Sequence, residues 1–224
     1  MDLQKKQAIL VIGAPASGKG TQAELLAKKA GYYHFITSKE GKDYLAANKS
    51  DPETAKQEEL YKSGKLFDPE WIFSVVKKRV NQIFEGGEKG IVFDGSPRTL
   101  FEAQNLLVFL SSLIGSENIK VIEVAVPEEE LKRRTGERLV CDKNASHVFS
   151  TRLSDAKEGQ KCPECEGVLR RRDLDSVFET RIENYRARTL PALEYLRKHG
   201  IVIAIDGERP VEEIHRDIVS RLGV

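Results

Sequence analysis

Apolar and polar positions follow two patterns along this chain. Short apolar runs at residues 8–12, 91–93, 121–126 and 201–205 are each flanked by turn or charged residues, which predicts strands buried on both faces. Between them, apolar residues recur at helical spacing in 21–29, 70–84, 99–114, 128–134, 177–198 and 211–222. Buried strands separated by helices predict a parallel sheet in an α/β fold.

Two segments interrupt this alternation. Residues 38–67 are polar and helical in character, with a break at Asn48–Pro52. Residues 139–172 are rich in Lys, Arg, Glu, Asp and Gly, and they contain all three cysteines. Neither a helical nor a strand period is strong enough there to predict a core. We expect this second segment to be disordered or to be held by something other than hydrophobic burial.

Length and composition narrow the protein class. At 224 residues the chain is long enough for a substantial core, either as one domain or as a core with insertions. Charged residues make up 32% and the formal net charge is +1, so no global field favours nucleic acid or an anionic membrane. Without a signal-peptide pattern or a long apolar run, we expect a soluble, cytoplasmic protein. Three cysteines are too few for a disulfide framework.

The segment after the first predicted strand has the Gly-x4-Gly-Lys spacing of a phosphate-binding loop. Its glycines let several backbone N–H groups turn inward toward phosphate oxygens, and the next helix directs its positive end to the same place. The alternative is a Gly-rich turn without a ligand. The loop comprises Gly13, Ala14, Pro15, Ala16, Ser17, Gly18, Lys19, Gly20 and Thr21.

A second loop, at residues 94–99, follows the strand at 91–93. Asp94, at the end of a strand beside a phosphate loop, is suited to orient water on a bound Mg²⁺. The planar guanidinium of Arg98 suits a second phosphate. The alternative is a tight turn with a surface arginine.

Together, Gly-Ala-Pro-Ala-Ser-Gly-Lys-Gly-Thr-Gln at 13–22 and Asp-Gly-Ser-Pro-Arg-Thr at 94–99 resemble the adenylate kinases. The resemblance extends through Ser63–Leu66, the cysteine-bearing segment and the turn Ile205–Gly207. It implies a P-loop NTPase-type parallel core (1–37, 68–138 and 172–224), a monophosphate-binding insertion (38–67) and a lid (139–171). It also implies a monomer that converts Mg-ATP and AMP reversibly into two ADP.

The resemblance also implies roles for individual residues. ATP would contact the loop at 13–21, and Arg133 would pack on its base. The catalytic set would be Lys19, Asp94, Arg98, Arg138, Arg170 and Arg181. The monophosphate would meet Ser38, Lys65, Phe67, Gly95, Arg98 and Glu102.

This chain departs from the family pattern at several positions. Ser96 replaces a usual Phe, and Glu137 replaces the first of two arginines, so Glu137 must turn away from a triphosphate. Residues 34–42 lack the arginine expected for the AMP phosphate, which leaves Lys39 or Lys42 as a point charge. Glu102 replaces a base-reading Gln, and an ionised carboxylate suits guanine better than adenine. A GMP kinase and a non-catalytic zinc-ribbon nucleotide binder therefore remain as alternatives.

The three cysteines point to a structural metal. Cys162 and Cys165 form a tight Cys-x2-Cys knuckle, and Cys141 lies upstream in the same segment. A structural zinc site needs four tetrahedral ligands. We expect His147 to be the fourth, with Asn144 and Asp142 as the alternatives, because imidazole suits zinc better. Zinc-bearing lids occur among adenylate kinases, and the resemblance supports the same site. The alternatives are a lid held by hydrogen bonds alone and a surface role for His147.

Overall fold

A five-stranded parallel sheet forms the centre of the protein. The structure is a computed structural model that describes residues 6–63, 65–143, 147–151, 154–171 and 175–224. Every neighbouring pair of strands in this sheet is parallel, which confirms the predicted α/β architecture. The strands lie in the order β2 (Tyr33–Ile36), β3 (Gly90–Asp94), β1 (Gln7–Gly13), β4 (Ile119–Ala125) and β8 (Val202–Asp206).

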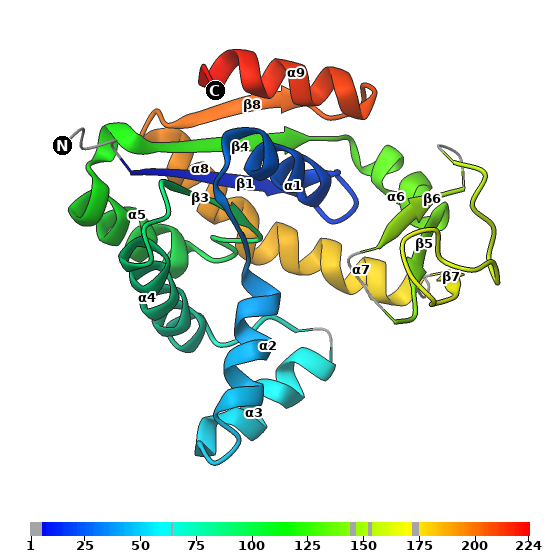
Figure 1. The fold of residues 1–224 in the computed structure, drawn as a ribbon, viewed down its shortest axis with the longest axis horizontal. Coiled ribbons are helices and arrows are strands. Elements are labelled where there is room, and N and C mark those ends of the chain that lie inside the picture. The colour runs from blue at the N-terminus through cyan, green and yellow to red at the C-terminus, as the bar shows by residue number, and fades with distance from the viewer. Residues whose placement is uncertain (1–5, 64, 144–146, 152–153, 172–174) are drawn as a thin grey trace.

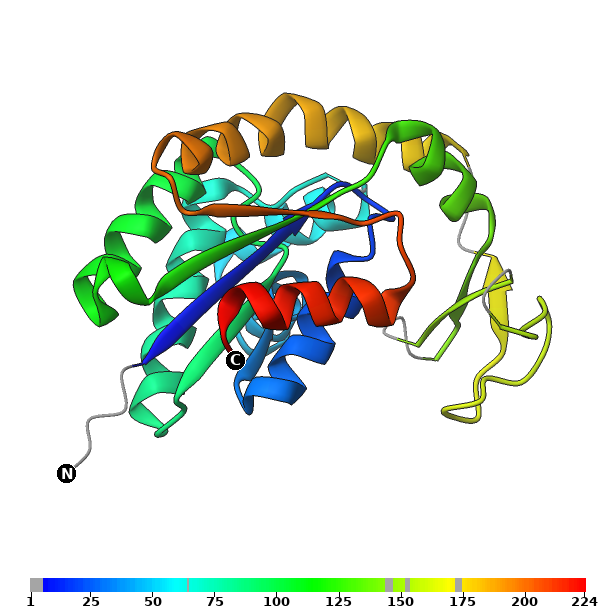
Figure 2. The ribbon, with the colours of Figure 1, turned by 90° about the horizontal axis from the view of Figure 1, so that it is seen from above.

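Helices cover both faces of the sheet (Figure 2). Because side chains alternate along a strand, Ile9 and Val11 pack with α1 (Lys19–Ala30) and α9 (Val211–Leu222). Leu10 and Ile12 point to the opposite face, where α4 (Pro69–Glu85), α5 (Leu100–Ile114) and α8 (Leu190–Lys198) pack. Burial on both faces explains why β1 is a continuous apolar run.

The predicted helices are all present, but two details differ from the sequence pattern. The expected single helix at 177–198 consists of α7 (Asp175–Asn184), a π-helical turn (Tyr185–Thr189) and α8. The sequence analysis missed β2, a four-residue edge strand that is only partly buried and so shows a weak apolar pattern. A 3₁₀ turn (Ser116–Asn118) precedes β4. Among the described residues, no helix is long and apolar enough to cross a bilayer.

The polar segment at 38–67 forms a pair of helices below the sheet in Figure 1. They are α2 (Thr37–Ala47) and α3 (Pro52–Lys62), and the predicted break lies between them. Asp51 caps α3 by accepting a hydrogen bond from the Glu53 amide at 2.9 Å, with Pro52 in the first helical turn.

The cysteine-bearing segment carries more structure than its composition predicts. It folds as a small antiparallel sheet in the order β6 (Val148–Ser150), β5 (Arg138–Cys141) and β7 (Leu169–Arg171), at the right of Figure 1. The expectation that it lacks a core is wrong, because Leu139, Cys141, Ala156, Cys162 and Leu169 form a buried cluster. Strands of three or four residues are too short for an alternation of apolar and polar positions to be recognised in the sequence. The helix α6 (Glu128–Gly136) leads into this sheet.

Candidate active site

The loop at 13–21 and the loop at 94–99 lie at the same edge of the sheet. In the strand register, Val11 lies opposite Asp94 and Gly13 lies opposite Val124. A Cβ atom on Gly20 would lie only 3.1 Å from Asp94 Oδ2, so the two loops nearly touch. As expected for a parallel sheet, the candidate residues collect beyond the carboxyl ends of the strands.

The first loop exposes the start of α1 in a form suited to an anion. Gly18 stands at the N-cap of α1 with a φ of 90° and without a side-chain cap, and the first turn of this helix contains no acidic residue. Ala16 has a φ of 65°, a left-handed conformation that costs a non-glycine residue about 1 kcal/mol. The amide groups and the helix dipole together favour bound phosphate.

The side chain of Lys19 lies in this loop among converging charges. Burial lowers the pKa of Lys19 to about 8. Asp94 opposes this shift, whereas the positive charges of Arg98, Arg138 and Arg181 add to it. The structure therefore brings together residues from α1, β3, β5 and α7 that are far apart in sequence.

Asp94 also faces a histidine that the sequence analysis left without a role. His34 Nε2 lies 3.9 Å from Asp94 Oδ2. This nitrogen is buried and has no hydrogen-bond partner among the described residues. Burial lowers the pKa of His34, and Asp94 partly offsets that effect. Because β2 pairs with β3, which ends at Asp94, predicting β2 from the sequence would have placed His34 near Asp94.

Glu102 lies at the start of α5 with both carboxylate oxygens engaged. Its Oε2 accepts a hydrogen bond from the Arg98 amide at 3.1 Å, and its Oε1 accepts one from the Thr99 hydroxyl at 3.0 Å. The Glu102 amide donates in return to Thr99 Oγ1 at 3.2 Å, so Thr99 is the side-chain N-cap of α5. Burial raises the pKa of Glu102, against the opposing effect of these hydrogen bonds.

The remaining monophosphate candidates lie around the root of the α2–α3 pair. Arg98 Nε donates to the Gly95 carbonyl at 3.0 Å. Ser38 is half-buried in the first turn of α2, and Lys65 is exposed. Phe67 is buried, with its ring centroid 5.5 Å from that of Tyr61.

A buried hydrogen bond joins the loop at 94–99 to the start of α2 at the border of this region. The Thr37 hydroxyl donates to Ser96 Oγ at 2.9 Å. Ser96 is the residue that replaces the family's usual Phe. Its hydroxyl therefore connects the second loop to the first residue of α2.

The two candidate lysines differ in their contacts. Lys39 Nζ lies 2.6 Å from Asp43 Oδ2 on an exposed helix face. Lys42 Nζ instead lies over the ring of Tyr61, 5.6 Å from its centroid. Lys39 is thus already neutralised by a carboxylate of its own helix.

Arginines near the small sheet make several ion pairs. Arg133 pairs with Glu130, and its Nη1 donates to Glu137 Oε1 at 2.8 Å. Glu137 is thereby held against Arg133, and the expectation that it turns away from a triphosphate stays a prediction. Arg170 is exposed on β7, with its Nε 3.8 Å from Asp142 Oδ2.

Comparison with known proteins identifies the family of the chain. The sequence model of the family described as adenylate kinase matches residues 11–201. The chain belongs to the adenylate kinase family. Its enzymatic activity is reversible phosphoryl transfer between ATP and AMP, and enzymes of this family use Mg²⁺ with ATP.

Individual adenylate kinases resemble the chain over nearly their whole length. The adenylate kinase of Archaeoglobus fulgidus is 35% identical over 216 residues, covering 96% of this chain and 97% of the relative. That of Streptomyces avermitilis is 34% identical over 221 residues, covering 96% of both. That of Caldicellulosiruptor saccharolyticus is 31% identical over 220 residues, covering 96% of this chain and 99% of the relative.

The small sheet brings together four potential metal ligands. Cys141, His147, Cys162 and Cys165 offer atoms that all lie within 4.8 Å of one another. The Cys141 and Cys165 sulfurs are 3.4 Å apart, and Cys162 Sγ is 3.5 Å from His147 Nδ1. Tetrahedral zinc bonds of about 2.0–2.3 Å put neighbouring ligand atoms at roughly these separations. The donor set and its spacing therefore fit zinc.

The contacts around this cluster distinguish the expected fourth ligand from its alternatives. His147 Nε2 lies 3.4 Å from Glu164 Oε2, which leaves Nδ1 directed at the sulfurs, as in carboxylate–histidine–metal arrangements. Asp142 Oδ1 instead accepts a hydrogen bond from the Val168 amide at 2.9 Å. Asn144 lies outside the described residues.

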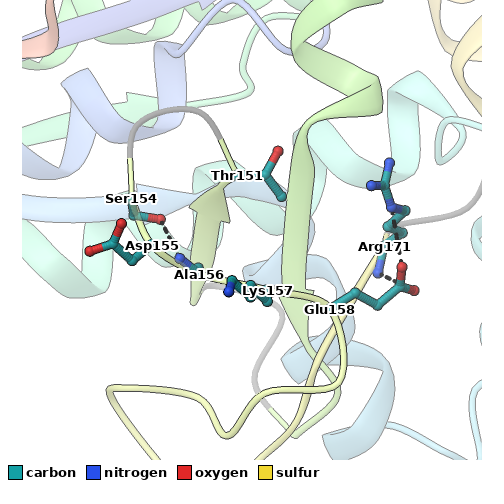
Figure 3. A pocket seen from close by; sticks show the side chains of 7 residues that line it. All are labelled: Thr151, Ser154, Asp155, Ala156, Lys157, Glu158 and Arg171. Carbon is teal, nitrogen blue, oxygen red and sulfur yellow. Dashed lines mark hydrogen bonds and ion pairs between the residues drawn. The ribbon is translucent and has the colours of Figure 1, made fainter.

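A shallow hollow in the small sheet contains none of the predicted site residues. Figure 3 shows its lining, in which Arg171 pairs with Glu158, their Nε and Oε2 atoms 3.1 Å apart. Arg171 Nη1 also donates to the Gly136 carbonyl at 2.8 Å, at the end of α6. These contacts connect the small sheet to the helix that enters it. The hollow is lined by Thr151, Ser154, Asp155, Ala156, Lys157, Glu158 and Arg171.

Proposed function

We propose that the residues around Lys19 carry out the transfer of the terminal phosphoryl group of Mg-ATP to AMP. The observation that carries this proposal is the convergence of Asp94, Arg98, Arg138 and Arg181 on the charge of Lys19. Positive groups held in advance around a developing negative charge supply most of the catalysis in phosphoryl transfer.

In this reaction a phosphate oxygen of AMP attacks the γ-phosphorus of ATP. The bond from that phosphorus to the β,γ-bridging oxygen breaks, and the electron pair leaves with ADP. Lys19 and the amides of Gly18, Gly20 and Thr21 hold the β- and γ-phosphates, while Arg138 and Arg181 neutralise the transferred group. Arg170 joins them when the lid closes. Asp94 would hold Mg²⁺ through water, and the ion would supply positive charge to offset that of the phosphates.

The two nucleotides would occupy opposite sides of this cluster. On the ATP side, the loop at 13–21 holds the phosphates and Arg133 packs on the base. On the monophosphate side, Arg98 holds the phosphate. The adenosine part lies along Ser38, Lys65, Phe67, Gly95 and Glu102.

We propose three functional parts in the chain. The core comprises 1–37, 68–138 and 172–224, the monophosphate insertion comprises 38–67, and the lid comprises 139–171. Zn²⁺ held by Cys141, His147, Cys162 and Cys165 would fix the fold of the lid, whose apolar cluster is small. A lid excludes water, which would otherwise compete with AMP as acceptor.

The test is ADP formation from Mg-ATP with AMP, GMP, CMP and UMP in parallel. We expect rates at least about tenfold higher with AMP, as one decade corresponds to about 1.4 kcal/mol of discrimination. A preference for GMP would identify a guanylate-specific enzyme. Absence of turnover with all four would leave a zinc-bearing nucleotide binder. Sedimentation of the same sample tests the proposed monomer.

A further inference from the structure

The guanidinium of Arg134 joins three segments that are distant in sequence. Its Nη1 donates to the Ser17 carbonyl at 3.3 Å, and its Nη2 donates to the Gly207 carbonyl at 2.8 Å. Its Nε donates to Glu130 Oε1 at 2.7 Å within α6. The side chain is only 19% exposed, so water competes weakly for these hydrogen bonds.

The segments that Arg134 joins surround the ATP side of the proposed site. Gly13 lies opposite Val124, and Ala125 lies opposite Asp206, so β1, β4 and β8 end side by side. The phosphate loop, α6 and the turn at 207–210 follow these three ends in turn. Arg134 therefore connects the three chain segments that follow these strand ends.

The bond to Ser17 fixes the orientation of a peptide group in the phosphate loop. In a trans peptide the carbonyl and the following N–H point in opposite directions. Arg134 holds the Ser17 carbonyl toward α6, so the Gly18 N–H is directed away from α6. Gly18 is one of the proposed phosphate donors.

The bond to Gly207 fixes a turn that packs tightly on β4. The Gly207 amide donates to the Ala125 carbonyl at 2.8 Å. A Cβ at this position would lie 2.6 Å from Val126 Cγ2 and 2.7 Å from Val124 Cγ1, so a side chain cannot be accommodated without movement. Arg134 thus anchors both a close-packed turn and the loop at 13–21 to α6.

We propose that Arg134 is a positioning residue for the triphosphate nucleotide, acting through the Ser17 carbonyl and the Gly207 turn. This inference rests on the proposed function, in which the loop at 13–21 binds ATP. Arg134 touches neither nucleotide. It fixes the donors that do, and the ion pair with Glu130 holds its guanidinium in the required plane.

The test compares Arg134→Met, which has similar volume and no donors, with Arg134→Lys. We expect Arg134→Met to raise the Kd and KM for Mg-ATP about tenfold, because charge-assisted hydrogen bonds to the loop are lost. The KM for AMP should change less than about twofold, because Arg134 makes no hydrogen bond to the residues proposed to bind AMP. Arg134→Lys should be intermediate, because one ammonium cannot reach both carbonyls.

Calorimetric ATP binding without AMP separates this inference from the proposed function, because it needs no turnover. Arg221→Met, which removes an exposed arginine paired with Asp217 on α9, is the matched control and should leave both KM values unchanged. Equal ATP affinity in Arg134→Met and Arg221→Met would overturn the inference, as would parallel rises in both KM values. If Arg134→Met does not fold, the same calorimetric measurement is made on Glu130→Gln, which removes the ion pair that holds Arg134. Unchanged ATP affinity in Glu130→Gln also overturns the inference.

Discussion

Thr99 and Glu102 exchange two hydrogen bonds at the start of α5: the Thr99 hydroxyl donates to Glu102 Oε1 at 3.0 Å, and the Glu102 amide donates to Thr99 Oγ1 at 3.2 Å. The sequence analysis treats Glu102 as an ionised base-reading group. In the folded protein, both of its oxygens already accept hydrogen bonds from the start of its own helix. The residue type of Glu102 is therefore weaker support for guanine than the sequence alone suggests.

Replacing Glu102 by Gln should change how stability depends on pH. Because the pKa of Glu102 is raised in the folded state, this carboxyl favours folding fully below its ordinary pKa. That contribution is lost as pH rises from the ordinary pKa through the raised one. Urea unfolding between about pH 4 and 7 should show this loss in the parent and not in Glu102→Gln. The exposed Glu70→Gln should behave like the parent, and identical profiles for all three would contradict the prediction.

ATP affinity should fall as pH rises above about 8, where Lys19 loses its proton in the nucleotide-free enzyme. Bound phosphate favours the charged ammonium, so binding above that pH must take up a proton. Calorimetry at pH 9 in buffers of different ionisation enthalpy measures this uptake. Lys19→Met should abolish it and weaken binding. Uptake that persists in Lys19→Met would assign the proton to another group.

The isolated enzyme should contain about one zinc ion per chain, held by the Cys141–His147–Cys162–Cys165 cluster. Cys165→Ser should lose the metal and lower the melting temperature, because the small sheet has few apolar contacts to replace it. Metal analysis and thermal unfolding with and without chelator measure both effects.

Asp142→Asn is the matched control for the metal prediction. Asn keeps an oxygen that accepts from the Val168 amide, so this variant should retain zinc. Loss of zinc in Asp142→Asn with retention in a His147→Ala variant would reverse the choice of fourth ligand.

Lys42, rather than Lys39, should supply the positive charge for the AMP phosphate. Lys39 is paired with Asp43 at 2.6 Å, whereas Lys42 lies against the neutral ring of Tyr61. Lys42→Ala should raise the KM for AMP about tenfold, as expected for a lost hydrogen bond between charged groups, with little change for ATP. Lys62→Ala, which removes an exposed lysine of the same insertion, should change neither KM. A larger effect of Lys39→Ala would contradict this assignment.

The strongest agreement between sequence and structure lies where local pattern and chemistry coincide. The apolar runs ending at Gly13 and Asp94 became neighbouring parallel strands, because burial on both faces leaves little alternative for such runs. The knuckle of Cys162 and Cys165 came together with Cys141 and His147. The edge strand β2 was missed because it is short and most of its residues are only partly buried, so its sequence is partly polar.

By itself, the sequence determined the α/β fold, the glycine-rich loop after the first strand and the cysteine cluster, since each depends on local spacing or on residue type. Only the tertiary structure decided which groups individual side chains contact. It directed Glu102 into hydrogen bonds at the start of its own helix, turned Glu137 toward Arg133, and gave Arg134 a partner 117 residues away in Ser17. Such contacts depend on the packing of strand ends and helices in three dimensions, and no local pattern in the chain records them.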